Sequence, residues 1–413
     1  MSNSFSMVAP HSKRPVVPDI IFGTGREAQD AEAKYGFEKV INSTLGVLMD
    51  DSGQLAFLPT VMERLHTLPD SELGAYAPIA GLPDYLSAVQ DACFRGNKPN
   101  AYSEAVATPG GTGAIKHAVW NYTEMGDEIL IANWYWAPYK TIAEEHGRRV
   151  RTFDYFKGDG MNVDAFKAAA SELIAAQERV LIILNTPAHN PTGYSISDGE
   201  WQEIMGFLRE KAADPSKKII LMVDVAYIDF AGSIDASRDF FKHFGDLPQN
   251  LLILTAFSLS KGYTMYGMRG GAIICLAATQ DLAAEFKDVC AYSNRAAWSN
   301  GTRAAMRILA DIYKDPALFD KVEEERQVFK AMLDRRNTVF MEEAQKVGLK
   351  TCPFRDGFFI TIPCKDPSSV SNALKKENLF AIPLQGGLRF APCAVSEEKC
   401  RVVPAMIKKY VQD

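Results

Sequence analysis

The chain has 413 residues, with 45 Lys and Arg against 51 Asp and Glu, and its formal net charge is −6 at pH 7. Its 47% hydrophobic and 23% charged residues are typical of globular proteins and exclude disordered, collagen-like and low-complexity chains. The acidic balance argues against nucleic acid or an anionic membrane as the main partner. A chain longer than about 300 residues is expected to form two domains, because a single hydrophobic core stops growing near that size.

The N-terminal residues 1–18 mix Ser, Asn, His, Lys and Pro without an apolar stretch, so we expect no signal peptide. No apolar run approaches the roughly 20 residues that a membrane-spanning helix requires. Seven cysteines, an odd number without Cys-x-x-Cys pairs, indicate reduced thiols and a cytoplasmic protein. His and Cys residues do not occur at the spacing of a zinc site, so no metal is expected.

The middle of the chain alternates short apolar runs with helical segments such as 164–177 and 197–213. The runs are rich in Ile, Leu and Val without polar alternation, which is typical of strands covered on both faces. These expected strands are 128–132, 179–185, 218–224, 250–256 and 271–276. The alternation predicts a mainly parallel sheet with helices on both sides, in a large α/β domain of residues 56–320.

The last hundred residues have a different pattern. Residues 317–347 form a long charged amphipathic stretch, which we expect to be a connecting helix. The elements that follow are short: strands at 357–362 and 387–390, a helix near 369–377 and a terminal helix from Ser396. They predict a smaller α+β domain of residues 321–413, which the N-terminal segment 1–55 is expected to join.

Polar side chains follow three of the expected strands at their carboxyl ends. Asn190 lies in a Pro-rich turn after 179–185, and the next strand ends in Asp224-Val-Ala-Tyr227. The strand after that leads into a Ser-Leu-Ser-Lys-Gly run that contains Lys261. Each motif alone has an ordinary explanation as a turn, a helix cap or a solvated lysine. Because ligands bind at the carboxyl edge of a parallel sheet, the three motifs in this order indicate one site.

With these motifs the sequence resembles the fold type I, pyridoxal-phosphate-dependent class I aminotransferases, in the subgroup of aspartate and aromatic aminotransferases. The similarity extends from about Val40 to the C-terminus. It implies an α/β fold with a large domain, whose mainly parallel seven-stranded sheet is sandwiched by helices, and a smaller α+β domain. It also implies pyridoxal 5′-phosphate as the cofactor and a homodimer whose active sites are shared across the interface.

The resemblance implies a role for each residue at the strand ends. Lys261 would form the Schiff base with the cofactor aldehyde, because a lysine amine in a desolvated, cation-rich pocket is partly deprotonated and nucleophilic. Asp224 would keep the pyridine nitrogen protonated, which makes the ring an electron sink. Tyr227 and Asn190 would hydrogen-bond the 3′-oxygen of the ring, and Asn190 would also lie beside the substrate.

A Gly-rich turn, Thr-Pro-Gly-Gly-Thr-Gly, precedes a helical run at 115–122. A helix N-terminus binds phosphate through its free N–H groups, although a Gly-rich turn alone is weak evidence. Arginine is suited to phosphate because its planar fork donates two hydrogen bonds. The resemblance places on the phosphate Gly111, Thr112, Ser258, Arg269 and, from the neighbouring subunit, Tyr76.

Besides Asn190, four residues match positions that contact the substrate. Arg389 would clamp the α-carboxylate, and Gly46 would close over it. Trp136 would stack on the cofactor ring beside the substrate, although core packing is the ordinary alternative for an aromatic residue. Arg295 matches an arginine that reaches the distal carboxylate of a dicarboxylic substrate from the neighbouring subunit. Aromatic-accepting members keep this arginine, so aspartate, glutamate and aromatic amino acids all remain open.

The predicted activity is therefore transfer of an amino group between an L-amino acid and a 2-oxo acid such as 2-oxoglutarate, in a ping-pong reaction through pyridoxamine phosphate. Trp298, Gly301 and the Gly-Tyr-Thr-Met run after Lys261 depart from common family members and leave the substrate range open. A β-lyase or a decarboxylase on the same fold is the alternative enzyme. A non-catalytic, aminotransferase-like regulatory domain is disfavoured, because the preceding 40 or so residues show no helix-turn-helix pattern.

Overall fold

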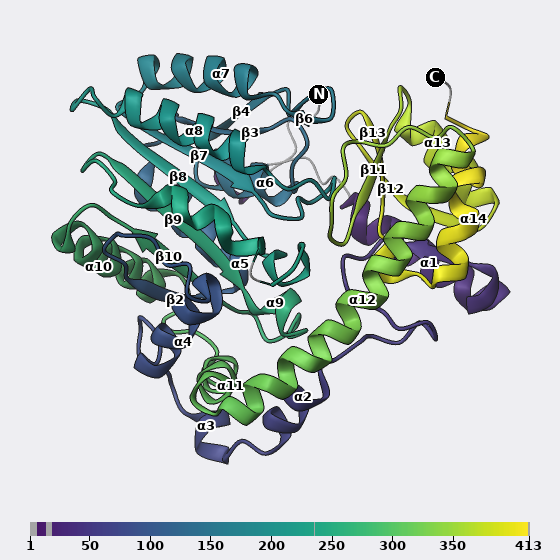
Figure 1. Ribbon diagram of the computed structural model, residues 1–413, viewed down its shortest axis with the longest axis horizontal. Coiled ribbons are helices and arrows are strands. Elements are labelled where there is room, and N and C mark those ends of the chain that lie inside the picture. Colours follow the sequence, from purple (N-terminus) through teal and green to yellow (C-terminus); the bar gives the residue numbers. More distant parts are fainter. Residues whose placement is uncertain (1–5, 14–18, 235, 412–413) are drawn as a thin grey trace.

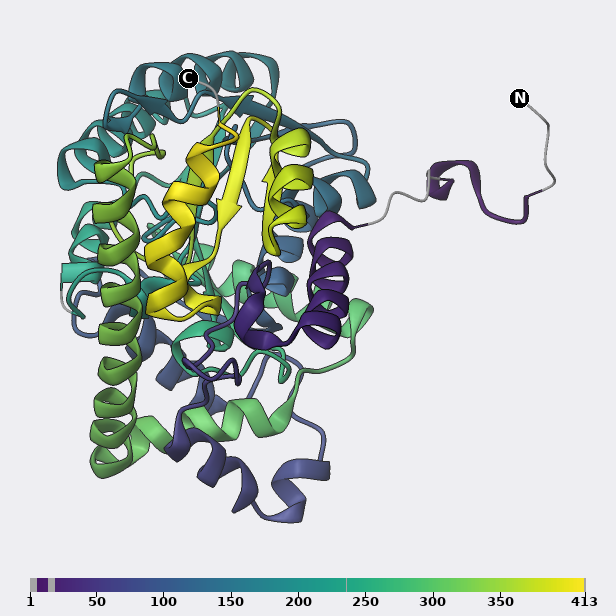
Figure 2. The same cartoon turned by 90° about the vertical axis from the view of Figure 1, so that its right-hand side faces the viewer.

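The computed structural model describes residues 6–13, 19–234 and 236–411. Part of the segment in which we expected no signal peptide, residues 1–5 and 14–18, lies outside the described residues. Residues 6–13 are exposed and extend away from the rest of the chain (Figure 2). Within the described ranges, none of the helices combines the length and the apolar character that crossing a bilayer requires.

A seven-stranded sheet in the order β2-β10-β9-β8-β7-β3-β4 forms the larger part of the fold (Figure 1). Neighbouring strands are parallel except at β10, which is antiparallel to both β2 and β9. The predicted mainly parallel, seven-stranded α/β fold is therefore confirmed. The strands are β2 (Ala105–Pro109), β3 (Glu128–Ala132), β4 (Arg149–Phe153), β7 (Arg179–Asn185), β8 (Lys218–Asp224), β9 (Leu251–Ser258) and β10 (Gly270–Leu276).

Both faces of this sheet are buried, because successive side chains of a strand point to opposite faces. In β7, Ile182 and Leu184 belong to one apolar core, whereas Leu181 and Ile183 belong to another. The helices of the first face include α7 (Val163–Ala176) and α8 (Asp198–Lys211), and those of the second include α5 (Gly110–Tyr122), α6 (Pro138–Glu145) and α10 (Gln280–Ala297). This double burial explains why the strand sequences show no polar alternation.

A four-stranded sheet, β1-β12-β13-β11, lies on the other side of the molecule (Figures 1 and 2). The N-terminal β1 (Ile41–Ser43) pairs in parallel with β12 (Leu379–Leu384), so Ile41 lies opposite Leu379. The strand predicted at 357–362 begins only at Ile360, because Gly357 adopts a φ of 100° that interrupts the extended backbone. The other elements here are α1 (Ile20–Tyr35), β11 (Ile360–Pro363), α13 (Pro367–Lys376), β13 (Gly387–Phe390) and α14 (Glu397–Lys408).

Helix α12 (Pro316–Lys346) joins the two sheets, as Figure 1 shows. The Asp315 side chain caps its first turn by accepting from the Ala317 N–H. Val322 packs into the core of the large sheet, and Phe340 packs into that of the small sheet. The domain boundaries 1–55, 56–320 and 321–413 remain a prediction.

The other described elements are η1 (Pro10–Ser12), η2 (Phe37–Lys39), α2 (Pro59–His66), α3 (Asp70–Gly74), α4 (Pro83–Phe94), β5 (Phe156–Lys157), β6 (Gly160–Met161), η3 (Ile228–Phe230), η4 (Ala236–Phe244), α9 (Leu259–Gly262), α11 (Arg303–Lys314) and η5 (Pro392–Ala394).

Candidate active site

The carboxyl ends of β7, β8 and β9 meet at one edge of the large sheet. Asn185 at the end of β7 lies opposite Asp224, which in turn lies opposite Ala256 of β9. Lys261 follows β9 in the short helix α9, and the antiparallel β10 starts from this same edge. The chain reversal between β9 and β10 therefore brings both Lys261 and Arg269 to the edge where Asp224 lies.

The Lys261 amine is enclosed by aromatic rings. Its Nζ donates to the Gly46 carbonyl at 2.5 Å and lies 4.8 Å from the ring centroid of Tyr266 and 5.6 Å from those of Tyr227 and Phe358. Burial, more than any other cause, lowers the pKa of Lys261 to about 8. A considerable fraction of this amine is therefore uncharged at slightly alkaline pH.

Asp224 is a buried carboxylate at the bottom of the same site. Its Oδ2 accepts from the Tyr139 hydroxyl at 2.6 Å, and its Oδ1 accepts from the Ala226 N–H at 3.1 Å. Burial raises the pKa of Asp224 above its ordinary value, and the Tyr139 bond opposes that rise. Tyr139 thus stabilises the charged form of a carboxylate that has lost most of its contact with water.

Replacing Tyr139 by phenylalanine should destabilise the protein more at pH 7 than at pH 4. Burial raises the pKa of Asp224 in the folded protein above its value in the unfolded chain. The free-energy cost of burying its charge is therefore absent below the unfolded-state pKa and complete above the folded-state pKa. Loss of a hydrogen bond to a buried charge costs about 1.5–3 kcal/mol, whereas the bond to a neutral carboxyl is worth about 1 kcal/mol. Urea unfolding of the cofactor-free protein measures both values.

The matched control is Tyr85→Phe. The Tyr85 hydroxyl is equally buried but donates to a neutral acceptor, the Gly271 carbonyl, at 2.7 Å. Its removal should cost the same free energy of unfolding at pH 4 and pH 7. A pH-independent loss in Tyr139→Phe as well would contradict the charge-stabilising role of Tyr139.

Asn190 and Tyr227 face each other across the site. The Asn190 side-chain amide donates to the Tyr227 hydroxyl at 3.2 Å. The backbone N–H of Asn190 is held by Asn185 Oδ1 at 2.7 Å, and the Asn185 amide donates to the Asp224 carbonyl at 2.8 Å. The ends of β7 and β8 are therefore joined by side-chain bonds that fix Asn190 relative to Asp224.

Helix α5 begins at the same edge with the predicted Gly-rich turn. A Cβ on Gly110 would lie 2.8 Å from Arg269 Nη2, so a side chain at position 110 would displace the guanidinium. Gly111 lies beside Ser258, because a Cβ on it would be in van der Waals contact with the Ser258 Cβ, at 3.7 Å. Thr112 lies in the first turn of the helix, where backbone N–H groups have no intrahelical acceptor. These N–H groups and the Arg269 guanidinium form a corner that fits a phosphate.

Arg389 is 4% exposed and reaches the site from the small sheet. Its Nη2 donates to the Thr44 carbonyl at 2.8 Å, its guanidinium lies 4.5 Å from the Phe359 ring centroid, and its buried Nε has no partner. A Cβ on Gly46 would lie 2.6 Å from Phe359, so a side chain at position 46 is excluded. Arg389 therefore keeps unused donors in a tight aromatic enclosure, which fits a carboxylate ligand.

Three further predicted residues are not fully buried: Trp136, Tyr76 and Arg295. Trp136 is half-buried and meets Tyr139 edge-to-face, with ring centroids 5.6 Å apart. Tyr76 is 86% exposed, and Arg295 is an exposed residue whose Nη1 donates to Ser299 Oγ at 2.5 Å. Tyr76 and Arg295 thus lie on the surface of the chain, outside the Lys261 enclosure.

Sequence reasoning missed three residues that touch the predicted ones: Tyr139, Tyr266 and Phe359. Tyr139 lies three residues after Trp136, in the segment that follows the carboxyl end of β3. This position at the ligand-binding edge of the sheet could have marked it as a candidate. Tyr266 follows Lys261 by five residues, and its hydroxyl accepts from the Leu48 N–H at 3.0 Å. The position of Phe359 depends on the interrupted extended segment before β11, which no separate sequence pattern indicated.

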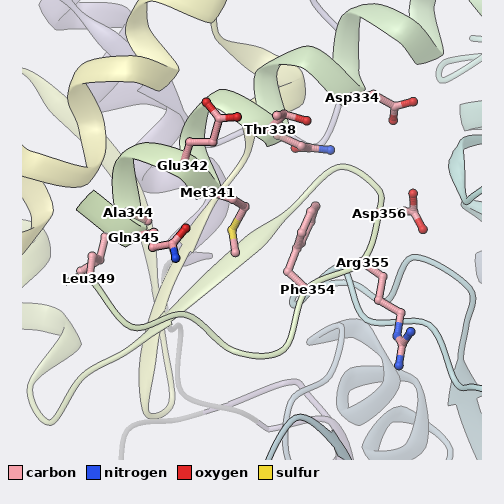
Figure 3. Close-up of a pocket in the computed structure, with 11 residues that line it drawn as sticks. Asp334, Thr338, Met341, Glu342, Ala344, Gln345, Leu349, Phe354, Arg355 and Asp356 are labelled. Atoms are coloured by element: carbon pink, nitrogen blue, oxygen red, sulfur yellow. The ribbon is translucent and has the colours of Figure 1, made fainter. Parts of the chain in front are cut away.

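A cavity of about 690 Å³ lies outside this site, between α12 and residues 354–356 (Figure 3). Asp334, Thr338 and Glu342 come from α12, and none of the predicted site residues lines the cavity. Its loop nevertheless supports the site, because the Arg355 and Asp356 N–H groups donate to the Gly193 carbonyl at 2.9 and 3.0 Å. The lysine, the carboxylate and the free arginine donors all lie elsewhere, so we place the chemistry at the sheet edge.

Comparisons with known proteins agree along most of the chain. The family profile "Aminotransferase class I and II" matches residues 38–407. The crystal structure of an aminotransferase from Anaerococcus prevotii DSM 20548 is 41% identical, with a TM-score of 0.97, and covers 99% of this chain and 100% of that one. The mitochondrial aspartate aminotransferase of Schizosaccharomyces pombe is 27% identical over 307 residues, 73% of this chain and 67% of the relative. The tyrosine aminotransferase of Rhizobium meliloti is 24% identical over 360 residues, 86% of this chain and 89% of the relative.

Proposed function

This chain belongs to the class I and II aminotransferase family of pyridoxal-phosphate-dependent enzymes, and we propose that it transfers an amino group from aspartate, glutamate or an aromatic amino acid to a 2-oxo acid such as 2-oxoglutarate. The observation that carries this proposal is the enclosed Lys261 amine, which shares one site with the buried Asp224 carboxylate and the free donors of Arg389. The curated relatives include both cytoplasmic and mitochondrial aspartate aminotransferases of S. pombe, and a cytoplasmic location remains a prediction.

The residues at the sheet edge fit pyridoxal 5′-phosphate. The corner at the start of α5 offers free N–H groups and a guanidinium to a dianion, and the Asp224 carboxylate offers an acceptor to a protonated ring nitrogen. When bound, the cofactor supplies an electron sink for negative charge at the substrate Cα. The proposed contacts are Lys261 with the aldehyde, Asp224 with the ring nitrogen, Tyr227 and Asn190 with the 3′-oxygen, Trp136 with the ring face, and Gly111, Thr112, Ser258 and Arg269 with the phosphate.

Lys261 is proposed to move the proton between the substrate Cα and the cofactor. Its pKa of about 8 lets the amine both accept and return a proton near neutral pH, which is the property of an efficient general base and acid. Arg389 would bind the α-carboxylate with its unused donors, while Phe359 and the backbone of Gly46 limit the movement of the substrate and exclude water.

The surface positions of Tyr76 and Arg295 support a homodimer in which each chain completes the site of the other. Tyr76 would reach the phosphate bound by the neighbouring subunit, and Arg295 would reach the distal carboxylate of its substrate. This arrangement would give the exposed Tyr76 a phosphate partner, and would give Arg295 a charged partner in addition to the Ser299 hydroxyl.

Replacing Arg295 by alanine should lower kcat/KM for aspartate and glutamate by about 10²-fold, because one charge-assisted bond to the distal carboxylate is lost. For tyrosine and phenylalanine, kcat/KM should change by less than about threefold. Arg335→Ala, which removes a similarly exposed arginine from α12, is the control and should affect neither group. An equal loss for both groups of substrates would contradict the proposed role of Arg295.

A mixture of two chains that are both impaired toward aspartate tests whether Arg295 acts across the interface. A chain with Arg295→Ala retains Lys261, and a chain with Lys261→Ala retains Arg295. Hybrid dimers should therefore contain one complete site and show more aspartate activity than either variant alone. If verified hybrid dimers show no such gain in aspartate activity, then Arg295 acts in the site of its own chain or has another role.

Product analysis with aspartate tests the reaction type itself. Oxaloacetate formed together with glutamate from 2-oxoglutarate supports transamination. Alanine and CO2 as the main products, without glutamate, would reject transamination in favour of a decarboxylase on the same fold. Measuring kcat/KM for aspartate, glutamate, tyrosine, phenylalanine and a few neutral amino acids then identifies the preferred donor.

A further inference from the structure

Five charged side chains form a buried cluster next to the Lys261 segment: Arg95, Asp229, Arg238, Glu323 and Arg326. Arg238 and Arg326 are fully buried, and Asp229 is 6% exposed. Burying charged groups is costly, and an apolar cluster of the same volume is often as stable or more stable. The presence of such a cluster is therefore better explained by the segments that it holds in place than by a gain in stability. Its contacts identify these segments.

The cluster contacts the residues that directly follow Lys261. Arg326, on α12, donates from its Nε to the Gly262 carbonyl at 2.7 Å, and its guanidinium lies 4.7 Å from the Tyr263 ring centroid. Asp229 lies so close that a Cβ on Gly262 would be 1.9 Å from its Oδ2. The backbone at Gly262 is thus fixed by a charged group on either side.

The same cluster includes a residue of the turn that carries Tyr227, because Asp229 lies two residues further along, in η3. Asp229 Oδ1 accepts from Arg238 Nη2 at 2.6 Å, and Arg238 donates to the carbonyls of Ala92 and Cys93 in α4. Burial alone would raise the pKa of Asp229, but the neighbouring arginines, Arg326 first, lower it to about 2, so this carboxylate is ionised.

Glu323 holds Arg326 in its orientation. It lies one turn before Arg326 on α12 and forms ion pairs with both Arg326 and Arg95. The cluster therefore links three segments: α12, the turn that carries Tyr227, and the helix that carries Lys261. Arg326 Nε donates to the Gly262 carbonyl and its Nη1 pairs with Glu323, whereas its buried Nη2 has no hydrogen-bond partner.

We propose that Arg326 is a positioning residue for Lys261. By donating a hydrogen bond from α12 to the Gly262 carbonyl, it holds the lysine amine in its enclosure near Tyr227. This inference rests on the proposed role of Lys261. It also means that α12, which packs into the cores of both sheets, is attached directly to the segment that carries the catalytic amine.

The test measures the reactivity of the Lys261 amine in the full-length protein after removal of the cofactor. Competitive labelling with an amine reagent, read by mass spectrometry across pH, reports the pKa and exposure of this lysine. With Arg326→Met the amine leaves its enclosure, its pKa rises toward the ordinary 10.5, and labelling at pH 8 falls by about tenfold or more. Amide hydrogen exchange of residues 259–266 should rise by a similar factor.

Arg326→Lys is the conservative variant and should restore part of the wild-type profile, because it keeps the charge beside Glu323 and one donor. In the loaded enzyme, kcat should fall about tenfold in Arg326→Met, while KM for the amino acid changes by less than about twofold, because Arg389 is untouched. If Arg326→Met does not fold, Gly262→Ala takes its place, because the new Cβ would collide with Asp229 Oδ2 and shift the backbone whose carbonyl Arg326 holds.

Arg148→Met is the matched control for loss of a buried arginine. Arg148 is 5% exposed and donates to Thr123 at the opposite edge of the large sheet, before β4. It should lower stability without changing the labelling of Lys261. If Arg326→Met behaves like this control, with lower stability but an unchanged Lys261 profile, the positioning role is overturned. Borohydride trapping of the cofactor on a different lysine would instead overturn the proposed role of Lys261.

Discussion

Lys261→Ala is expected to reduce kcat for transamination by at least about 10⁴-fold, because one substitution removes both the covalent anchor of the cofactor and the general base. Borohydride treatment should then add no cofactor mass to the chain. Lys399→Ala is the matched control, since Lys399 is also a buried lysine, with its Nζ donating to the Phe37 carbonyl at 2.9 Å, but lies in the small α+β part. Full activity of Lys261→Ala would reject the proposed function outright.

The same variant has a predicted effect on stability that depends on pH. The folded-state pKa of Lys261, about 8, lies below its ordinary value of 10.5, so the unfolded chain binds more protons between these two values. The penalty for burying this lysine is therefore complete below pH 8 and fades as the pH rises toward 10.5. Cofactor-free Lys261→Ala should gain stability relative to wild type at pH 7, and that gain should shrink by pH 10. Denaturant unfolding at the two pH values measures the difference.

Asp224→Asn is expected to lower kcat by about 10³-fold, the scale seen when a charged group that stabilises a transition state is removed. The amide keeps the volume of the carboxylate and can still accept from Tyr139, so the loss reports the charge. Cofactor-free Asp224→Asn should be at least as stable as wild type, because burial raises the pKa of Asp224 and so disfavours its charged form.

Asp229→Asn provides the contrast within the same segment. Asp229 is equally buried, but its pKa is lowered to about 2 by Arg326, Arg238 and Arg95, so its charge is stabilising in the folded state. Its loss should destabilise the protein by about 3 kcal/mol or more, because paired arginines are left without their partner. Equal stability changes in Asp224→Asn and Asp229→Asn would contradict this difference between a carboxylate whose charge is disfavoured by burial and one whose charge is paired with arginines.

The large sheet could be predicted from the sequence because its central strands are apolar on both faces. The strands 128–132, 179–185 and 218–224 have the bounds that the apolar runs indicated. Asn190, Asp224 and Lys261 could be grouped for the same reason, since the ends of parallel strands meet at one edge. The roles of these residues come from the family resemblance and remain proposals.

The surroundings of the site could not be predicted in the same way. Phe359 reaches Arg389 only because Gly357, with its φ of 100°, ends the extended run before β11. The Tyr139 hydroxyl reaches Asp224 across a sequence separation of 85 residues. Such contacts depend on how whole elements pack, and neither hydrophobic periodicity nor a local motif encodes them. The burial of Asp229 and Arg326 could not be predicted either, because charged residues normally face solvent.

The pairing of β1 with β12 has a consequence for synthesis on the ribosome. Residues 41–43 leave the exit tunnel long before Leu379, their partner, has been translated. During that interval their backbone N–H and C=O groups form an open edge, to which the strand of another nascent chain could add. A strand of only three residues is a poor template for such pairing, and its shortness protects the unfinished chain from aggregation while it waits for its C-terminal partner.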